Sequence, residues 1–189
     1  MTIRPYKDTD REAVHDACLY CDGPENYSES TKNFLFATYC DYYIEKEPFN
    51  CFVAADDSDR AVGYIICAED FDSFIKTFRE EYFTRIPEDD TSCRYYASAS
   101  TEVPEKYKED YPAHLHIDIL HGFHRMGLGK RLMDTLISHL KEKGVRGIVL
   151  GVNAKNEQGV NFYKKYGFEL LGEDPDTMAF GMKLQEKSL

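Results

Sequence analysis

The stretch that decides the fold runs from Ala113 to Val152 and reads AHLHIDILHGFHRMGLGKRLMDTLISHLKEKGVRGIVLGV. Its opening residues alternate polar and apolar side chains, and this period of two predicts a strand over 113–120. Apolar side chains then recur at helical spacing from Gly129 to Lys143, and Gly144 follows as a typical helix-ending residue. The continuously apolar run over 147–152 is typical of a strand buried on both faces. Strand, helix and strand in this order predict a parallel pair with a right-handed crossover, so the fold class is mixed α/β.

The loop between the first strand and the helix has the composition of an anion-binding site. It reads HGFHRMGLGK over 121–130, and Gly127 and Gly129 allow the backbone to approach a ligand closely. The helix that follows adds the positive end of its dipole, so the loop predicts a phosphate or pyrophosphate site. The nearby cations are His124, Arg125, Lys130 and Arg131. A simple tight turn is the alternative interpretation, and neither a Walker A loop nor a G-x-G-x-x-G fingerprint is present.

Periodicity and turn residues predict the remaining elements. Before the central stretch they are an edge strand in TIRPYK, a helix ending near Cys21, a helix over 31–46, a hairpin over 49–56 and 61–69, and a helix over 71–86. After it they are a helix over 156–166 and strands over 168–171 and 178–184. The segment 87–112 has no clear period, and a lid and an acidic surface excursion both fit it. We expect a single domain over 1–189, with 87–112 as an insertion or lid-like segment.

The charge balance restricts the class of partner. The chain of 189 residues has 34 Asp and Glu against 23 Lys and Arg, a formal net charge of -11, which disfavours nucleic acid and membrane surfaces. No apolar run has the length of a spanning helix, and the first residues lack a signal-peptide core, so we expect a cytoplasmic protein. The six cysteines are expected to be reduced, with a zinc or redox role for the C-x-x-C of Cys18 and Cys21 as the alternative.

Two motifs then resemble a known family. HRMGLG at 124–129 resembles the acyl-CoA loop pattern Q/R-x-x-G-x-G/A of the GCN5-related N-acetyltransferase (GNAT) superfamily, with His124 where the pattern has Gln or Arg. The downstream pattern N-x-x-A/G-x-x-F-Y-x-x-x-G-F is matched at Asn156, Gly159, Phe162, Tyr163, Gly167 and Phe168. The resemblance covers 113–184 closely. Within the superfamily, AHLHIDIL is similar to the central strand of the acetyltransferase-like domain of O-GlcNAc hydrolases.

The resemblance implies acetyl-CoA as the acyl donor, with no metal, in a wedge where the strands over 113–120 and 147–152 splay apart. The backbone near Ile119 would pair with the pantetheine, and the loop would hold the pyrophosphate. The implied donor-binding residues are Ile119, His124, Arg125, Met126, Gly127, Leu128, Gly129, Lys130, Asn156 and Phe162. Asn156 also suits a helix cap, and the two roles are compatible.

The resemblance also implies direct attack of a primary amine on the thioester. Tyr163 would protonate the departing thiolate. The polar face of the strand offers His114, His116 and Asp118 as bases for the proton of the amine, and His116 and Asp118 are favoured. Each of these residues has a purely structural alternative, and a bulge in the strand would change which side chains face the acceptor. The acidic composition favours a cationic amine such as a polyamine or a lysine. The alternative function is a catalytically silent acyl-CoA or peptide binding module, and the family makes a homodimer a further expectation.

Overall fold

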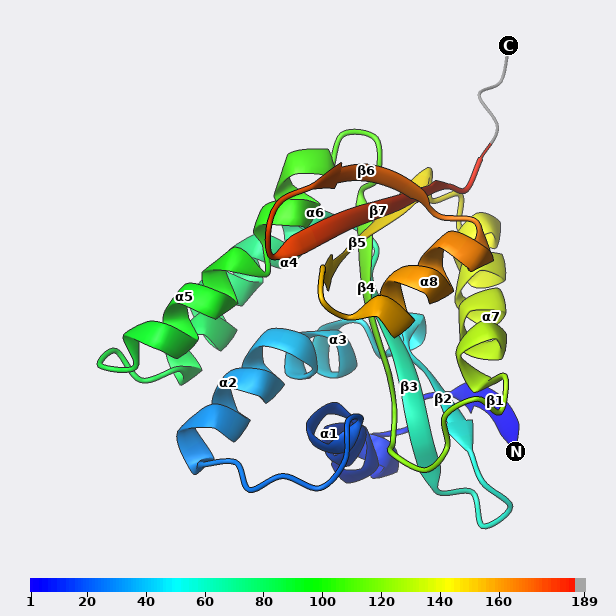
Figure 1. Cartoon of the computed structure of the whole chain (residues 1–189), viewed down its shortest axis with the longest axis horizontal. Helices are drawn as coiled ribbons and strands as arrows, with labels where there is room; N and C mark the ends of the chain where they lie inside the picture. Colours follow the sequence, from blue (N-terminus) through cyan, green and yellow to red (C-terminus); the bar gives the residue numbers. More distant parts are fainter. Residues whose placement is uncertain (186–189) are drawn as a thin grey trace.

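The computed structural model describes residues 1–185, which fold around one mixed seven-stranded sheet. The strands lie in the order β1-β2-β3-β4-β5-β7-β6 (Figure 1). Their bounds are β1 Thr2–Pro5, β2 Phe52–Ala55, β3 Ala61–Ala68, β4 Ala113–Ile119, β5 Gly147–Asn153, β6 Glu169–Glu173 and β7 Thr177–Lys183. All neighbours are antiparallel except β4 and β5, which are parallel. The predicted α/β class, the edge strand and the parallel pair are confirmed.

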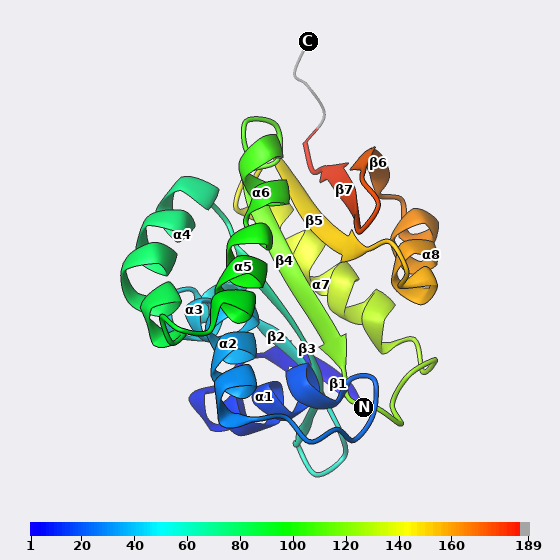
Figure 2. The same ribbon diagram turned by 60° about the vertical axis from the view of Figure 1, so that its left-hand side comes forward.

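Helices cover both faces of this sheet. Their bounds are α1 Arg11–Tyr20, α2 Glu29–Tyr39, α3 Asp41–Lys46, α4 Phe71–Thr77, α5 Thr91–Ala99, α6 Glu102–Tyr107, α7 Leu128–Glu142 and α8 Glu157–Tyr166. Figure 2 shows α7 and α8 on one side of the sheet and α1 to α6 on the other. One apolar cluster packs under α7 and α8 around Leu132 and Leu136, and a second packs under the other helices around Tyr43 and Phe74.

The parallel pair at the centre of the sheet separates soon after it begins. Within residues 1–185, β4 and β5 pair only at Ala113 with Ile148 and at His114 with Val149. Beyond these positions β4 stays paired with β3 as far as Ile119, without a register shift. Because the sheet opens here, a ligand can reach backbone groups of β4 that no neighbouring strand occupies.

Three predicted elements differ from the structure. The helix expected over 31–46 breaks at Cys40, whose φ of -134° is not helical, so that α3 turns and buries Tyr42, Tyr43 and Ile44. The helix expected over 71–86 is α-helical only to Thr77 and then continues as a π-helical turn. The segment 87–112 is not an irregular loop, because it forms α5 and α6. Buried Ala97 anchors α5, and the Tyr107 hydroxyl on α6 donates to the carbonyl of Leu171 at 3.1 Å.

Candidate active site

The loop after β4 leads into α7 through left-handed backbone conformations. Arg125 has a φ of 60° and Gly127 a φ of 75°. Gly127 is the N-cap of α7 and supplies no side-chain cap, so the first-turn N–H groups have no intrahelical acceptor. A Cβ on Gly129 would lie 3.5 Å from the ring of Phe162 on α8. The loop therefore presents backbone donors at a helix N-terminus, which is the arrangement that binds phosphate groups.

A cleft of about 990 Å³ opens beside this loop and runs along the end of β4 that is not paired with β5. Its walls are the end of β4, the loop, the first turns of α7 and α8, and the residues that follow α1. Among the predicted site residues it is lined by Asp118, Ile119, His124, Arg125, Gly127, Leu128, Gly129, Lys130, Asn156, Phe162 and Tyr163. His116 and Met126 are absent from the lining within residues 1–185, and Met126 is 54% exposed to solvent.

The predicted cations differ in their relation to the cleft. Arg125 lines it, and so does Lys130, whose ammonium group also pairs with the Asp134 carboxylate at 2.6 Å. Arg131 instead donates to the backbone carbonyl of Met1 at 3.3 Å, at the start of the chain. Of the four side chains predicted as a cationic cluster, His124, Arg125 and Lys130 line the cleft, whereas Arg131 points toward Met1.

His124 forms a contact within the loop. Its Nε2 lies 2.7 Å from the backbone carbonyl oxygen of Ile119, the last residue of β4. This bond joins the end of the strand to the loop, and His124 also lines the cleft.

Tyr163 lies on α8 at the edge of the cleft. Its ring packs against Phe162, Phe168 and Phe180, with ring centroids 5.3 to 6.1 Å away, and only 9% of the residue is exposed. Burial, and secondarily the charge of Asp118, raises the pKa of this phenol well above its usual value. Within residues 1–185 its hydroxyl has no hydrogen-bond partner. Because its pKa is raised, the phenol is protonated at neutral pH, and it lines the cleft as a potential proton donor.

Asp118 lies on β4 at the other side of the gap. Its Oδ2 accepts a hydrogen bond from the hydroxyl of Tyr64, on the neighbouring strand β3, at 2.5 Å. Burial raises the pKa of Asp118 to about 7; the hydrogen bond from Tyr64 lowers this pKa, and the charge of Asp22 raises it. A carboxyl group that titrates near neutral pH is suited to general base catalysis.

His116, the other predicted base, faces the aromatic cluster under α2 and α3. Its Nε2 lies 3.1 Å from the hydroxyl of Tyr43, which also lies 3.0 Å from Nε2 of His114. Burial lowers the pKa of His116 to about 4, and burial together with His116 lowers the pKa of His114 to about 3. Both imidazoles are therefore neutral at pH 7, and Asp118 has the better placed and better matched basic group.

Asn156 caps α8, which is one of the two roles predicted for it. Its Oδ1 accepts a hydrogen bond from the backbone N–H of Gly159 at 2.8 Å. The same residue lines the cleft, so the cap and a contact to a ligand remain compatible.

Sequence reasoning missed several groups at the site, three of which lie close to Asp118. Cys21 and Asp22, which follow α1, line the cleft, and buried Tyr64 lies behind Asp118. The C-x-x-C marked the position of Cys21, but only the packing of α1 against β3 and β4 brings it to the cleft. All six cysteines are free thiols.

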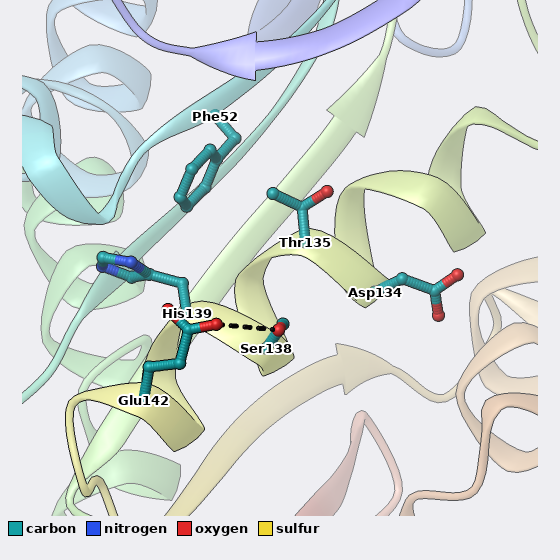
Figure 3. Close-up of a pocket in the computed structure, with 6 residues that line it drawn as sticks. All are labelled: Phe52, Asp134, Thr135, Ser138, His139 and Glu142. Atoms are coloured by element: carbon teal, nitrogen blue, oxygen red, sulfur yellow. Dashed lines mark hydrogen bonds between the residues drawn. The ribbon is translucent and has the colours of Figure 1, made fainter.

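A second cavity of about 460 Å³ lies over α7 next to β2 (Figure 3). It is lined by Phe52, Asp134, Thr135, Ser138, His139 and Glu142. Its polar groups bond within the protein. Ser138 donates to Glu142 at 3.4 Å, and Nε2 of His139 lies 2.9 Å from Oδ1 of Asn50. The cleft at β4 differs from this cavity because it is bordered by the glycine loop and by Tyr163.

Residues 1–185 contain no group of three or more His, Cys, Asp or Glu side chains placed to hold a metal ion. In this part of the chain, no helix combines the length and the apolar character needed to cross a membrane.

Comparisons with known proteins identify the family of the chain. Protein O-GlcNAcase of Rattus norvegicus is 26% identical over 210 aligned residues, covering 97% of this chain but 22% of the relative, so the chain spans about a fifth of that protein's length. Mycothiol acetyltransferase of Propionibacterium freudenreichii is 38% identical over 52 residues, 28% of this chain and 17% of that protein. The crystal structure of SsHAT shares 27% identity and a TM-score of 0.84, with 98% of each chain covered. A family model described as acetyltransferase (GNAT) family matches residues 16–168. This match spans most of the chain and confirms the resemblance of the two motifs: the chain belongs to the GNAT acetyltransferase family.

Proposed function

We propose that this protein transfers an acetyl group from acetyl-CoA directly to a primary amine. The observation that carries the proposal is the cleft at the gap between β4 and β5, which brings together a phosphate-binding type of loop, a buried phenol and a carboxyl group of raised pKa. The family membership and the partial match to mycothiol acetyltransferase support acetyl transfer as the reaction class.

The loop and the opened strand fit the donor. The first-turn amides of α7 and the side chain of Arg125 would hold the pyrophosphate, as expected for an anion at a helix N-terminus. The unpaired edge of β4 near Ile119 would bind the pantetheine amides in the manner of an added strand. Gly129 keeps the space between the loop and Phe162 free of a side chain.

The chemistry needs two proton transfers. As the amine nitrogen forms a bond to the thioester carbon, its proton passes to the Asp118 carboxylate. As the carbon–sulfur bond breaks, the Tyr163 hydroxyl gives its proton to the sulfur. A pKa of about 7 for Asp118 leaves a substantial ionised fraction at neutral pH, and the raised pKa of Tyr163 keeps the phenol protonated.

The acceptor side of the cleft favours a cationic amine. Asp22 and Asp118 line it together, and the whole chain carries a formal charge of -11. A protonated amine or a second ammonium group of a polyamine would therefore be attracted to this side.

A release assay tests the proposal. Free CoA is measured after mixing the protein with acetyl-CoA and a panel of cationic, neutral and acidic amines. We expect CoA release that depends on cationic amines and falls strongly in Tyr163→Phe. The competing function is a binding module without catalysis, in line with a curated relative that is named for another activity. It predicts acetyl-CoA binding by calorimetry but no amine-dependent release in either protein.

A further inference from the structure

Tyr64 is a fully buried tyrosine whose hydroxyl serves Asp118. It is 0% exposed, it lies on β3, and it pairs directly with Asp118 across the antiparallel strands. Its hydroxyl donates to Oδ2 of Asp118 at 2.5 Å. The phenol oxygen in turn accepts a weak hydrogen bond from the thiol of Cys40, with sulfur and oxygen 3.9 Å apart.

The direction of the tyrosine proton follows from the carboxylate. The ionised carboxyl group of Asp118 has no proton to give, so the hydroxyl of Tyr64 is the donor in their bond, and the contact from the Cys40 thiol is compatible with this direction. A carboxylate has about four acceptor positions, so the bond to Tyr64 leaves others free to accept a proton from the cleft. A hydroxyl buried in an apolar cluster is stable only when it is hydrogen-bonded, and this requirement couples the tyrosine to Asp118.

We propose that Tyr64 is a positioning residue for the transfer reaction: it fixes the orientation of the Asp118 carboxylate and stabilises its ionised form. This inference rests on the proposed function, because it assigns a helper to the base of that reaction. Tyr64 lies behind Asp118, is absent from the cleft lining within residues 1–185, and therefore acts only through the carboxylate.

Other groups also act on Asp118. Burial and the charge of Asp22 raise its pKa, whereas the hydroxyl of Tyr64 and the thiol of Cys21 lower it. Cys40 and Tyr39 on the α2 side and Tyr163 on α8 are close enough for the Asp118 charge to raise their own pKa values. His116, two residues away on the same strand face, is neutral at pH 7. Of these groups, Tyr64 is the one with a direct hydrogen bond of 2.5 Å.

The test is the pH dependence of kcat/KM in Tyr64→Phe. Removing the hydroxyl takes away a bond to the charged carboxylate, so the pKa of Asp118 rises and the acidic limb of the profile moves to higher pH. We expect about a tenfold lower kcat/KM at pH 6, with partial recovery above pH 8, since each pKa unit changes the ionised fraction tenfold. Thermal unfolding of the same samples checks that the variant is folded.

Tyr82→Phe is the matched control. Tyr82 is also 0% exposed, and its hydroxyl also donates to a carboxylate, Glu45 at 2.8 Å, but this pair lies on the α3 side, outside the cleft lining of residues 1–185. The acidic limb of the kcat/KM profile of Tyr82→Phe is expected to coincide with that of the wild type. If Tyr64→Phe lowers kcat/KM by the same factor at every pH, Tyr64 has only a structural role and the proposal is overturned.

A second variant covers the case in which Tyr64→Phe does not fold. Site-specific 3-fluorotyrosine at position 64 keeps the shape of the side chain but is a stronger hydrogen-bond donor. The acidic limb should then move to lower pH, opposite to the shift in Tyr64→Phe, and an unchanged limb would overturn the proposal. Wild-type protein that releases no CoA with any amine refutes the proposed function itself. If the wild type is active and both variants have its acidic limb, only the role of Tyr64 is refuted.

Discussion

Tyr163 and Asp118 line one cleft from opposite faces of the sheet. Tyr163 packs in the apolar cluster under α7 and α8, whereas Asp118 points with His114 and His116 toward the cluster under α1 to α3 and bonds Tyr64 there. The two faces communicate because β4 and β5 part after their first two paired positions. In the proposed reaction, Tyr163 would serve the leaving sulfur and Asp118 the attacking nitrogen from these two faces.

Replacing Tyr163 by phenylalanine should affect the chemical step more than donor binding. The ring stays packed against Phe168 and Phe180, while the proton donor is lost. We expect kcat to fall about a hundredfold or more, the usual contribution of a general acid. Calorimetry should give a Kd for acetyl-CoA close to that of the wild type. A large loss of acetyl-CoA affinity with an unchanged kcat would assign Tyr163 to binding instead.

The left-handed glycine at the start of α7 should be needed for donor binding. Alanine at Gly127, where φ is 75°, strains the loop by about 1 kcal/mol or more and disturbs the amides that face the cleft. The matched control is Gly144→Ala at the other end of the same helix, where φ is 78°. Both variants should lose similar stability in thermal unfolding, but only Gly127→Ala should bind acetyl-CoA more weakly. Equal affinities in the two variants would argue against the loop as the phosphate site.

Alanine substitutions of the two arginines near the loop should have different effects on the affinity for CoA. Arg125 lines the cleft, whereas Arg131 bonds the carbonyl of Met1. Arg125→Ala should raise the Kd for CoA about tenfold, the scale of one charge-assisted hydrogen bond, and the loss should shrink at high salt. Arg131→Ala should leave the Kd unchanged. The opposite order would place the pyrophosphate near β1.

Acid stability should depend on Glu45, away from the cleft. Burial opposes the charge on Glu45, but hydrogen bonds from Arg85, Arg11 and Tyr82 prevail and lower its pKa from 4.5 to about 2. Its stabilising contribution is therefore complete above pH 4.5 and is lost as the pH falls toward 2. Glu45→Gln should cost about 1 kcal/mol at pH 7, a value reduced by solvent screening, and almost nothing at pH 2. In denaturant unfolding, the control Glu29→Gln, on an exposed pair with Lys32, should match the wild type at both pH values.

The sequence allowed the central stretch to be predicted because its signals are local. The alternation over 113–120 predicts β4, and the glycines of HRMGLG predict the turn into α7. The break at Cys40 was not predictable, because no proline or glycine marks it and the residue is held by burial under β3. For α5 a local signal did exist. The carboxylate of Asp90 caps the helix by accepting from the N–H of Cys93, and Asp is a preferred residue at such a cap.

The candidate site also combines residues that local motifs predict with residues that only the tertiary structure brings together. Motif spacing predicted Tyr163 and the loop, because each belongs to a motif whose residues lie close together in the chain. Tyr64 and Asp22 reach the site only through strand pairing and the packing of α1. The choice between His116 and Asp118 also needed three dimensions, since both occupy the same face of β4 and only Asp118 lies at the cleft.

The most direct measurement of the central claim follows the acetyl group itself. The protein is incubated with acetyl-CoA carrying a ¹³C-labelled acetyl group and a cationic diamine, and mass spectrometry then locates the label in the amine, the CoA thioester and the intact protein. Direct transfer predicts label on the amine nitrogen and none on the protein, Cys21 in the cleft included. Label that remains entirely on CoA bound by the protein, or that accumulates on Cys21, would contradict the account.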